Sequence, residues 1–136
     1  MSEDFVSFEI AKKLKEKGFN DACNAYYHIC DDNIDSQNSF EYTGDMGYNF
    51  INSKNKYRCA APTIYQALKW LRKEKSYHIE FIGNACGYLF IVSDIPSKGG
   101  TDRYCSDYSG PNDGGTWDIY EEAALAGIEY VLDNLI

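Results

Sequence analysis

The sequence lacks any apolar run long enough to cross a membrane, because its longest uninterrupted run covers only residues 88–92. It also lacks a basic start followed by an apolar segment, so we expect no signal peptide. Its five cysteines are an odd number without the spacing of a disulfide framework. We interpret them as reduced thiols, most of them small core residues. These absences predict a cytoplasmic protein with no membrane association.

Positive charge is scarce, with 13 basic residues against 21 acidic ones and a net charge of −8. Such an acidic chain repels polyanions at long range, so nonspecific nucleic-acid binding is disfavoured. An apolar fraction of 44%, with 15% aromatic residues, nevertheless excludes a disordered chain. We expect residues 1–136 to form a single packed domain. The 12 tyrosines are interpreted mainly as half-buried strand residues, with a binding surface as the alternative.

The clearest local pattern lies in residues 61–81. Thr63 and Gln66 have the spacing of a capping box, which predicts that a helix begins there. Apolar residues then recur at helical spacing and predict one buried stripe, formed by Ile64, Ala67, Leu68 and Leu71. Residues 77–81 alternate between apolar and polar side chains, as in a half-buried strand.

A further helix is predicted near each end of the chain. Ser7 can cap a helix over residues 8–17, and Gly18 has the position of a left-handed residue that ends it. Asp118 is predicted to open a last helix that reaches about residue 135. Gly127 lies at the edge of the apolar face of that helix, which predicts close approach of another element.

Strands are predicted at residues 25–30, 57–60, 77–82 and 88–93, with the last two joined as a hairpin through loop 83–87. The strand 88–93 is apolar on both faces, so we expect it to be central and covered on each side. The predicted fold class is α+β. An antiparallel sheet of about four strands packs against the middle and last helices, and the first helix lies at an edge or end.

Two segments give no clear element. Residues 31–55 are rich in Asn and Asp, which predicts turns with one or two brief strands. Residues 96–116 are rich in Gly and Pro and too long for a simple connection, so this loop is either functional or locally disordered.

Charges are segregated along the chain. Residues 54–75 hold seven of the 13 basic residues, whereas residues 76–136 hold ten acids and two bases. The favoured interpretation is two solvated helix faces, one on the middle helix and one on the last helix, where Glu122, Glu129 and Asp133 lie opposite the apolar stripe. Attraction between the two elements or between subunits is an alternative, worth about 0.2 to 1 kcal/mol per exposed pair. Another is a small phosphate-binding patch at Lys69, Arg72 and Lys73.

The candidate metal sites are incomplete. A calcium-loop pattern begins at Asp31, but Ser36 and Tyr42 stand where the loop needs Gly and Glu. Cys23, His28 and Cys30 could supply zinc ligands, but the paired spacing of a zinc site is absent. We therefore expect no metal and no cofactor.

The signals for catalysis are equally sparse. His78 shares a predicted strand face with Glu80, which could orient it as a base, but no pattern indicates which cysteine it would activate. Residues 97–101 resemble a phosphate cradle without the P-loop spacing. The balance is against an enzyme, although it does not exclude one.

Residues 60–72, 77–80, 120–128 and 11–19 together resemble a family of small uncharacterised proteins. That family is associated with Bacteroides-type gut bacteria and their phages or mobile elements. The resemblance covers both ends and the middle of the chain and implies an intracellular protein associated with a mobile element. It implies no activity and no catalytic residues.

The leading functional hypothesis is a non-enzymatic binding or accessory protein that acts through a surface on another protein or on a second copy of itself. Two surfaces are candidates: Tyr65, Lys69, Arg72 and Lys73 on the middle helix, or the aromatic residues Tyr104, Tyr108 and Trp117. The alternative is a small hydrolase or ligand-binding domain whose pocket is covered by loop 96–116.

Overall fold

A computed structural model describes residues 4–29, 40–43, 49–52, 57–106, 110–112 and 115–136. Cys30, Tyr108 and the calcium-like segment 31–36 lie outside the described residues. The chain divides into two compact units, Met1–Thr63 and Ile64–Ile136. Each unit is α+β, as the sequence predicts, and each has its own antiparallel sheet. A single domain over residues 1–136 stays a prediction.

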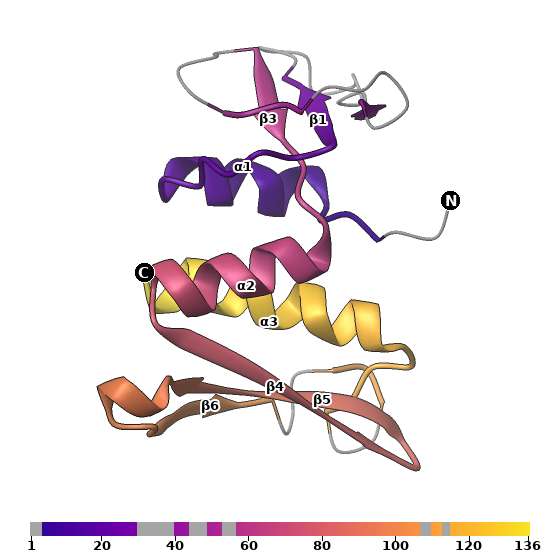
Figure 1. The fold of residues 1–136 in the computed structure, drawn as a ribbon. Coiled ribbons are helices and arrows are strands. Elements are labelled where there is room, and N and C mark those ends of the chain that lie inside the picture. The colour runs from indigo at the N-terminus through magenta and orange to yellow at the C-terminus, as the bar shows by residue number, and fades with distance from the viewer. Residues whose placement is uncertain (1–3, 30–39, 44–48, 53–56, 107–109, 113–114) are drawn as a thin grey trace. The chain divides into compact units, whose positions relative to one another are not determined.

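The described residues of the first unit form one helix and a three-stranded antiparallel sheet (Figure 1). Its elements are α1 (Phe8–Glu16), β1 (Ala25–His28), β2 (Phe40–Tyr42) and β3 (Arg58–Ala60). The strand order is β2-β1-β3, so β1 is central, and α1 contacts β3. The side chain of Ser7 accepts a hydrogen bond from the Ile10 amide and so caps α1.

Helix α1 ends in a Schellman motif, in which Gly18 is the predicted left-handed residue. Gly18 has a φ of +97°, and the Phe19 amide donates to the Leu14 carbonyl over 2.9 Å. Leu14 and Phe19 are both fully buried, so the hydrophobic contact that usually accompanies this motif can form. The helix therefore ends because of its local sequence.

The second unit packs two helices against one face of a second three-stranded sheet, as Figure 1 shows. Its elements are α2 (Ile64–Glu74), β4 (Tyr77–Asn84), β5 (Gly87–Asp94), the short helix η2 (Pro96–Lys98), β6 (Asp102–Cys105) and α3 (Tyr120–Asn134). The strand order is β4-β5-β6, which places β5 in the centre as predicted. Helix α3 contacts β4 and β5, and α2 contacts β4 and α3.

The core of the second unit follows the predicted apolar stripes with small changes. Leu71 and Ile128 are fully buried, whereas Leu68 and Leu125 are half-buried. Trp70 is 5% exposed and joins the buried side of α2. The strand alternation also holds, because Ile79 is buried and its neighbours His78 and Glu80 are not.

Gly127 confirms the predicted close approach. A Cβ atom at this position would lie 3.1 Å from the Ile79 Cγ2 atom and 3.3 Å from the Phe90 ring. A helix residue with a side chain would therefore have to displace one of these neighbours. Glycine lets α3 lie close to β4 and β5.

The prediction of one sheet with about four strands is wrong. Strands β1 and β3 pair with each other in the sheet of the first unit, while β4 and β5 belong to the second sheet. Strand β2 is one of the brief strands predicted within residues 31–55, whereas β6 lies within 96–116, where no strand was predicted. Segment 96–116 is thus not one long loop, since it contains η2 and β6.

Three local predictions also need correction. The turn between β4 and β5 has two residues, not five, because the pairing continues to Asn84↔Gly87. Helix α3 begins after Ile119 without a side-chain cap, and Asp118 instead accepts a hydrogen bond from Asn112 over 2.7 Å. Strand β5 is not fully buried on both faces, since Phe90 is buried but Ile91 is half-buried.

Strand β6 is held to β5 by an ion pair at a break in register. Val92 pairs with Tyr104 and Ser93 with Asp102, which leaves Arg103 as an extra residue. Such a bulge redirects a side chain, and here the Arg103 guanidinium donates to both carboxylate oxygens of Asp94, with a shortest distance of 2.7 Å. These hydrogen bonds raise the pKa of Arg103. The Asp94 side chain is 9% exposed, so this partner compensates its burial.

Candidate functional site

The predicted surface residues of α2 form one exposed stripe. Tyr65, Lys69, Arg72 and Lys73 follow each other at helical spacing, and all four are exposed. Tyr65 is 68% exposed and so presents most of its ring to solvent. None of these four residues lines either of the two depressions described below.

The predicted aromatic residues behave differently, because two of them line a cleft. Tyr104 in β6 and Trp117 before α3 both border a cavity of about 210 Å³ at the surface of the second unit. The other lining residues are Phe90, Ala126, Glu129, Tyr130, Asp133 and Asn134. We call this cavity the aromatic cleft. Tyr108 lies outside the described residues, so its position relative to the cleft stays a prediction.

Four aromatic rings form the walls and floor of the aromatic cleft. Tyr104 and Tyr130 are stacked, with ring centroids 3.9 Å apart and planes inclined by 15°. The Phe90 ring lies 5.8 Å from Tyr104 and 5.7 Å from Trp117, measured between centroids. Phe90 is 2% exposed, whereas the other three rings are half-buried. Phe90 therefore forms the floor, and the three outer rings are accessible to a ligand.

The opposite wall comes from one side of α3. Ala126, Glu129, Tyr130, Asp133 and Asn134 are spaced by three or four residues, so they project from the same side of the helix. Of the two acidic residues that line the cleft, Glu129 is half-buried and Asp133 is exposed. None of the residues that line the cleft is basic.

Backbone pairing fixes Trp117 independently of its side chain. The Tyr88 amide donates to the Trp117 carbonyl over 2.7 Å, and the Trp117 amide donates to the Tyr88 carbonyl over 2.9 Å. This isolated bridge ties the segment before α3 to the start of β5. The backbone amide and carbonyl of Trp117 are thus both hydrogen-bonded to Tyr88, which fixes the backbone that bears the indole.

Sequence reasoning found only part of this cleft. It singled out Tyr104 and Trp117 but assigned Glu129 and Asp133 to a solvated face opposite the apolar stripe of α3. The residue that could have indicated the cleft is Tyr130. It is an aromatic residue between these two acids, on a helix whose buried side chains are small or aliphatic.

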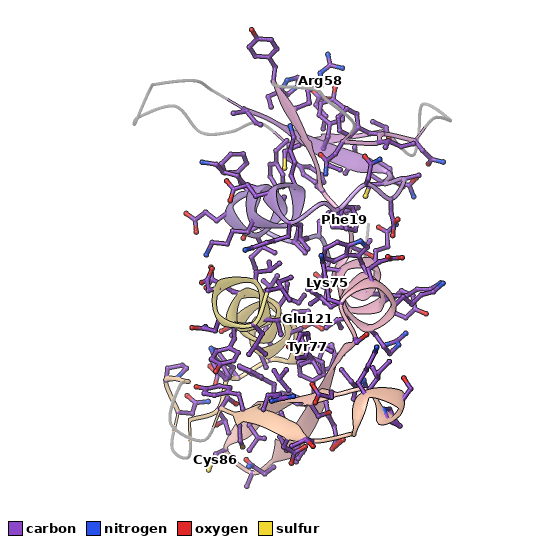
Figure 2. All side chains as sticks on the ribbon, turned by 90° about the vertical axis from the view of Figure 1, so that its left-hand side faces the viewer. Phe19, Arg58, Lys75, Tyr77, Cys86 and Glu121 are labelled. Carbon is purple, nitrogen blue, oxygen red and sulfur yellow. The ribbon has the colours of Figure 1, made fainter. Side chains whose placement is uncertain are left out.

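A second depression lies at the end of the β4–β5 hairpin. It is broad and open, and its lining consists of residues 83–88 and Asp118. Figure 2 shows Cys86 at this end of the second unit, away from α2 and α3. The Cys86 carbonyl accepts hydrogen bonds from Thr116 Oγ1 over 2.8 Å and Asn112 Nδ2 over 2.9 Å. These polar side chains therefore fasten the hairpin turn and are already engaged.

The catalytic alternatives gain no geometry from the described residues. His28 Nε2 lies 3.7 Å from Glu41 Oε1, and both side chains are more than one-third exposed. Neither of the two depressions is lined by a histidine. Burial raises the pKa of Cys23 to about 12 and that of Cys59 to about 11, which makes both thiols poor nucleophiles at neutral pH.

Metal binding also lacks a described site. Within the part of the chain that the structure describes, no three His, Cys, Asp or Glu side chains gather as a metal-ligating group. Cys23 is buried in the first unit, and its presumed co-ligand Cys30 is not among the described residues. Of the four described cysteines, Cys23 and Cys59 are core residues, but Cys86 and Cys105 are exposed.

Comparisons of the chain with protein-family models, with curated proteins and with solved structures give no match. Among the described residues, no helix is both long enough and apolar enough to cross a membrane. The fold and the aromatic cleft are therefore the observations on which a function can be argued.

Proposed function

We propose that this is a binding protein that takes a small group of its partner into the aromatic cleft between α3, β5 and β6. The observation that carries this proposal is the cleft itself, a cavity of about 210 Å³ with three accessible aromatic rings. Binding sites for small groups are typically concave, mostly apolar and supplied with a few polar residues. The cleft is concave and combines four aromatic rings with about as much polar lining, whereas neither described depression is lined by residues of α2.

The size of the aromatic cleft restricts what it can hold. Pockets for drug-sized ligands and cofactors measure roughly 300 to 1,000 Å³. A cavity of about 210 Å³ suits one amino-acid side chain or a small head group instead. Burying about 100 Å² of such a group contributes about 2.5 kcal/mol, and millimolar binding needs about 4 kcal/mol. Useful affinity therefore requires further contacts outside the cleft, as a protein partner provides.

Of the two candidate surfaces predicted from the sequence, this proposal uses the aromatic residues and not the residues of α2. It keeps a binding protein that acts through Tyr104 and Trp117, and the enzyme alternative has no described histidine at either depression. A partner protein remains part of the proposal. The α2 stripe of Tyr65, Lys69, Arg72 and Lys73 stays a prediction, and it serves as an internal comparison surface in the experiment.

The test is a titration of isotopically labelled protein with a set of capped single amino acids, followed by amide and indole NMR signals. We expect saturable shifts at Trp117 and along residues 126–134, with dissociation constants of about 15 mM, the value that corresponds to about 2.5 kcal/mol, and no saturable shifts along 65–73. Substitution Y130A should abolish these shifts, because it removes one wall, while K69A on the exposed α2 surface should leave them unchanged. Shifts confined to α2, or no saturable shift with any probe, would overturn the proposal.

A further inference from the structure

The outer edge of β4 is the longest free strand edge among the described strands, since β4 has eight residues and the sheet order is β4-β5-β6. We infer that two copies of the chain pair along this edge, antiparallel and about a two-fold axis at Ile79, so that their two sheets join into one. This second interaction surface goes beyond the proposed function and does not depend on it, because no residue of β4 lines the aromatic cleft.

The edge of β4 lacks most of the features that keep strand edges from pairing with another chain. Natural proteins protect such edges by short length, bulges, proline or charged residues, especially lysine. Strands β2 and β3 have three residues each, and β6 has four with a bulge at Arg103. Strand β4 instead pairs with β5 over eight residues without a break in register (Figure 1). It contains no proline or lysine, and Glu80 is its one formally charged residue.

Hydrogen bonds on the far side of β5 show which backbone groups of β4 face the free edge. Two residues directly opposite each other in an antiparallel pair either bond to each other or both face away, in alternation. The Phe90 amide donates to Ser106 Oγ over 2.8 Å, and the Phe90 carbonyl accepts from the Ser106 amide over 3.0 Å. Phe81, which lies opposite Phe90, therefore directs its amide and carbonyl outward, as do Ile79 and Tyr77 by alternation. Among the described residues, no hydrogen bond to these outward groups is found.

The sequence of β4 is complementary to itself in the antiparallel direction, which is why a second copy is the partner. Residues 77–81 read Tyr-His-Ile-Glu-Phe, with aromatic residues at both ends and Ile79 at the centre. In pairing about Ile79, each Tyr77 lies opposite Phe81 of the second copy, and each His78 lies opposite Glu80. Cross-strand aromatic pairs and pairs of opposite charge stabilise antiparallel sheets. The outward amides and carbonyls of the three odd-numbered residues would all gain partners.

Other positions of the axis are less favourable. An axis at Glu80 would place two carboxylates directly opposite each other, which is destabilising. An axis at His78 would place Glu80 opposite Ser76, which has a φ of +65° and is not part of β4. An axis at Phe81 would place Glu80 opposite the apolar side chain of Ile82. The side chains of residues 77–81 therefore select the register centred on Ile79.

Charge variants of the two polar residues of this segment test both the pairing and its register. His78 is half-buried and Glu80 is exposed, so neither substitution enters the core. Sedimentation equilibrium of the whole chain, up to millimolar concentration, should show a dimer. Variants H78E and E80K should each weaken it about 10-fold, because each loses two cross-strand pairs. Variant E122K, at an exposed position on α3, makes the same change in charge as E80K and should have no effect.

An equimolar mixture of H78E and E80K is the decisive sample. Only in the mixed dimer does the new carboxylate of one variant face the new ammonium group of the other, so we expect association to return to that of the parent chain. In the parent, amide hydrogen exchange at Tyr77, Ile79 and Phe81 should slow as concentration rises, while exchange within α3 stays constant.

Three results would overturn the inference. A parent chain that stays monomeric would leave this edge to a strand of another protein. If H78E and E80K dimerise as the parent does, association uses another surface. If each variant is weakened but their mixture does not recover, the register about Ile79 is wrong. The substituted residues lie outside the aromatic cleft, so the proposed function is decided separately by its own titration.

Discussion

Asn52 connects two backbone segments of the first unit, and its replacement by leucine is expected to destabilise that unit strongly. Its side chain is 2% exposed. The Nδ2 atom donates to the Phe19 carbonyl over 2.8 Å, and the Oδ1 atom accepts from the Ala60 amide over 2.7 Å. Ala60 lies in β3, at an edge of the sheet, so this amide points away from β1 and has the Asn52 oxygen as its acceptor.

The size of the effect follows from these two hydrogen bonds. In N52L the Ala60 N–H stays buried without its acceptor, which costs about 1 to 3 kcal/mol, and the bond to Phe19 is lost at about 1 kcal/mol more. The expected loss is therefore about 2 to 4 kcal/mol of unfolding free energy. This is a large part of the roughly 5 to 15 kcal/mol that stabilises a typical domain.

The variant N52D adds a pH dependence that leucine cannot show. A neutral carboxyl group can both donate to the Phe19 carbonyl and accept from Ala60, as the amide does. A buried carboxylate is disfavoured, so its folded-state pKa lies above the unfolded value of about 3.9. The variant is thus closest to the parent at low pH and loses stability as pH rises through the folded-state pKa.

Urea unfolding followed by the amide signals of β1 and β3, with hydrogen exchange at Ala60, measures these changes. Variant N49D, at an exposed position nearby, is the control for the change in charge. The reasoning is refuted if N52L unfolds within about 0.5 kcal/mol of the parent protein, a range typical of surface substitutions. It is also refuted if N52D and N49D show the same dependence on pH.

Three further predictions follow from single residues. Alkylating reagents at neutral pH should label Cys86 and Cys105 rapidly in the folded protein and reach Cys23 and Cys59 only on unfolding, as peptide mass mapping will show. The free energy of unfolding should fall between pH 9 and about 11, by about 1.4 kcal/mol per pH unit for each buried thiol. In this range the thiols ionise in the unfolded chain but stay protonated in the folded protein, where the pKa is about 12 for Cys23 and about 11 for Cys59. Valine at either position should flatten this slope, and an unchanged slope would contradict it. Substitution G87A should lower the thermal midpoint strongly, since Gly87 has a φ of +135° and a Cβ there would clash with the Trp117 carbonyl, whereas A85G in the same turn should have little effect.

The helices could be predicted because their signals are local. Ser7 and Gly18 mark the two ends of α1 within a dozen residues, and both act as predicted. The apolar stripe of α2 and the alternation in β4 depend on spacings of two to four residues. Such patterns need no knowledge of what the segment packs against.

The arrangement of the strands could not be predicted in the same way. Assigning β1 and β3 to one sheet and β4 and β5 to another depends on pairing between residues far apart in sequence. Strand β6 is a four-residue segment, Asp102–Cys105, with two charged residues, so its own sequence gives little strand signal. It is extended because β5 offers it hydrogen-bonding groups and because Asp94 binds Arg103.

The aromatic cleft was partly predictable for a related reason. A helical wheel divides α3 into a buried side and a solvated side, and Glu129 was placed on the second. The structure shows that Glu129 and Tyr130 are half-buried residues at the boundary between these sides. Boundary positions line a groove only when another element stops short of covering them. In the second unit the element that stops short is β6 (Asp102–Cys105), which the sequence did not predict.

The cleft is a consequence of how closely α3 approaches the sheet. Because Gly127 has no side chain, α3 can lie close to the Phe90 ring. This ring then forms the floor of the aromatic cleft. Three residues after Gly127, Tyr130 stacks on Tyr104, whose neighbour Arg103 is paired with Asp94 at the edge of the sheet. The same packing that stabilises the second unit thus brings rings and carboxylates together at its surface. For this reason the proposed binding residues come from three separate segments of the chain, β5–β6, the approach to α3, and α3 itself.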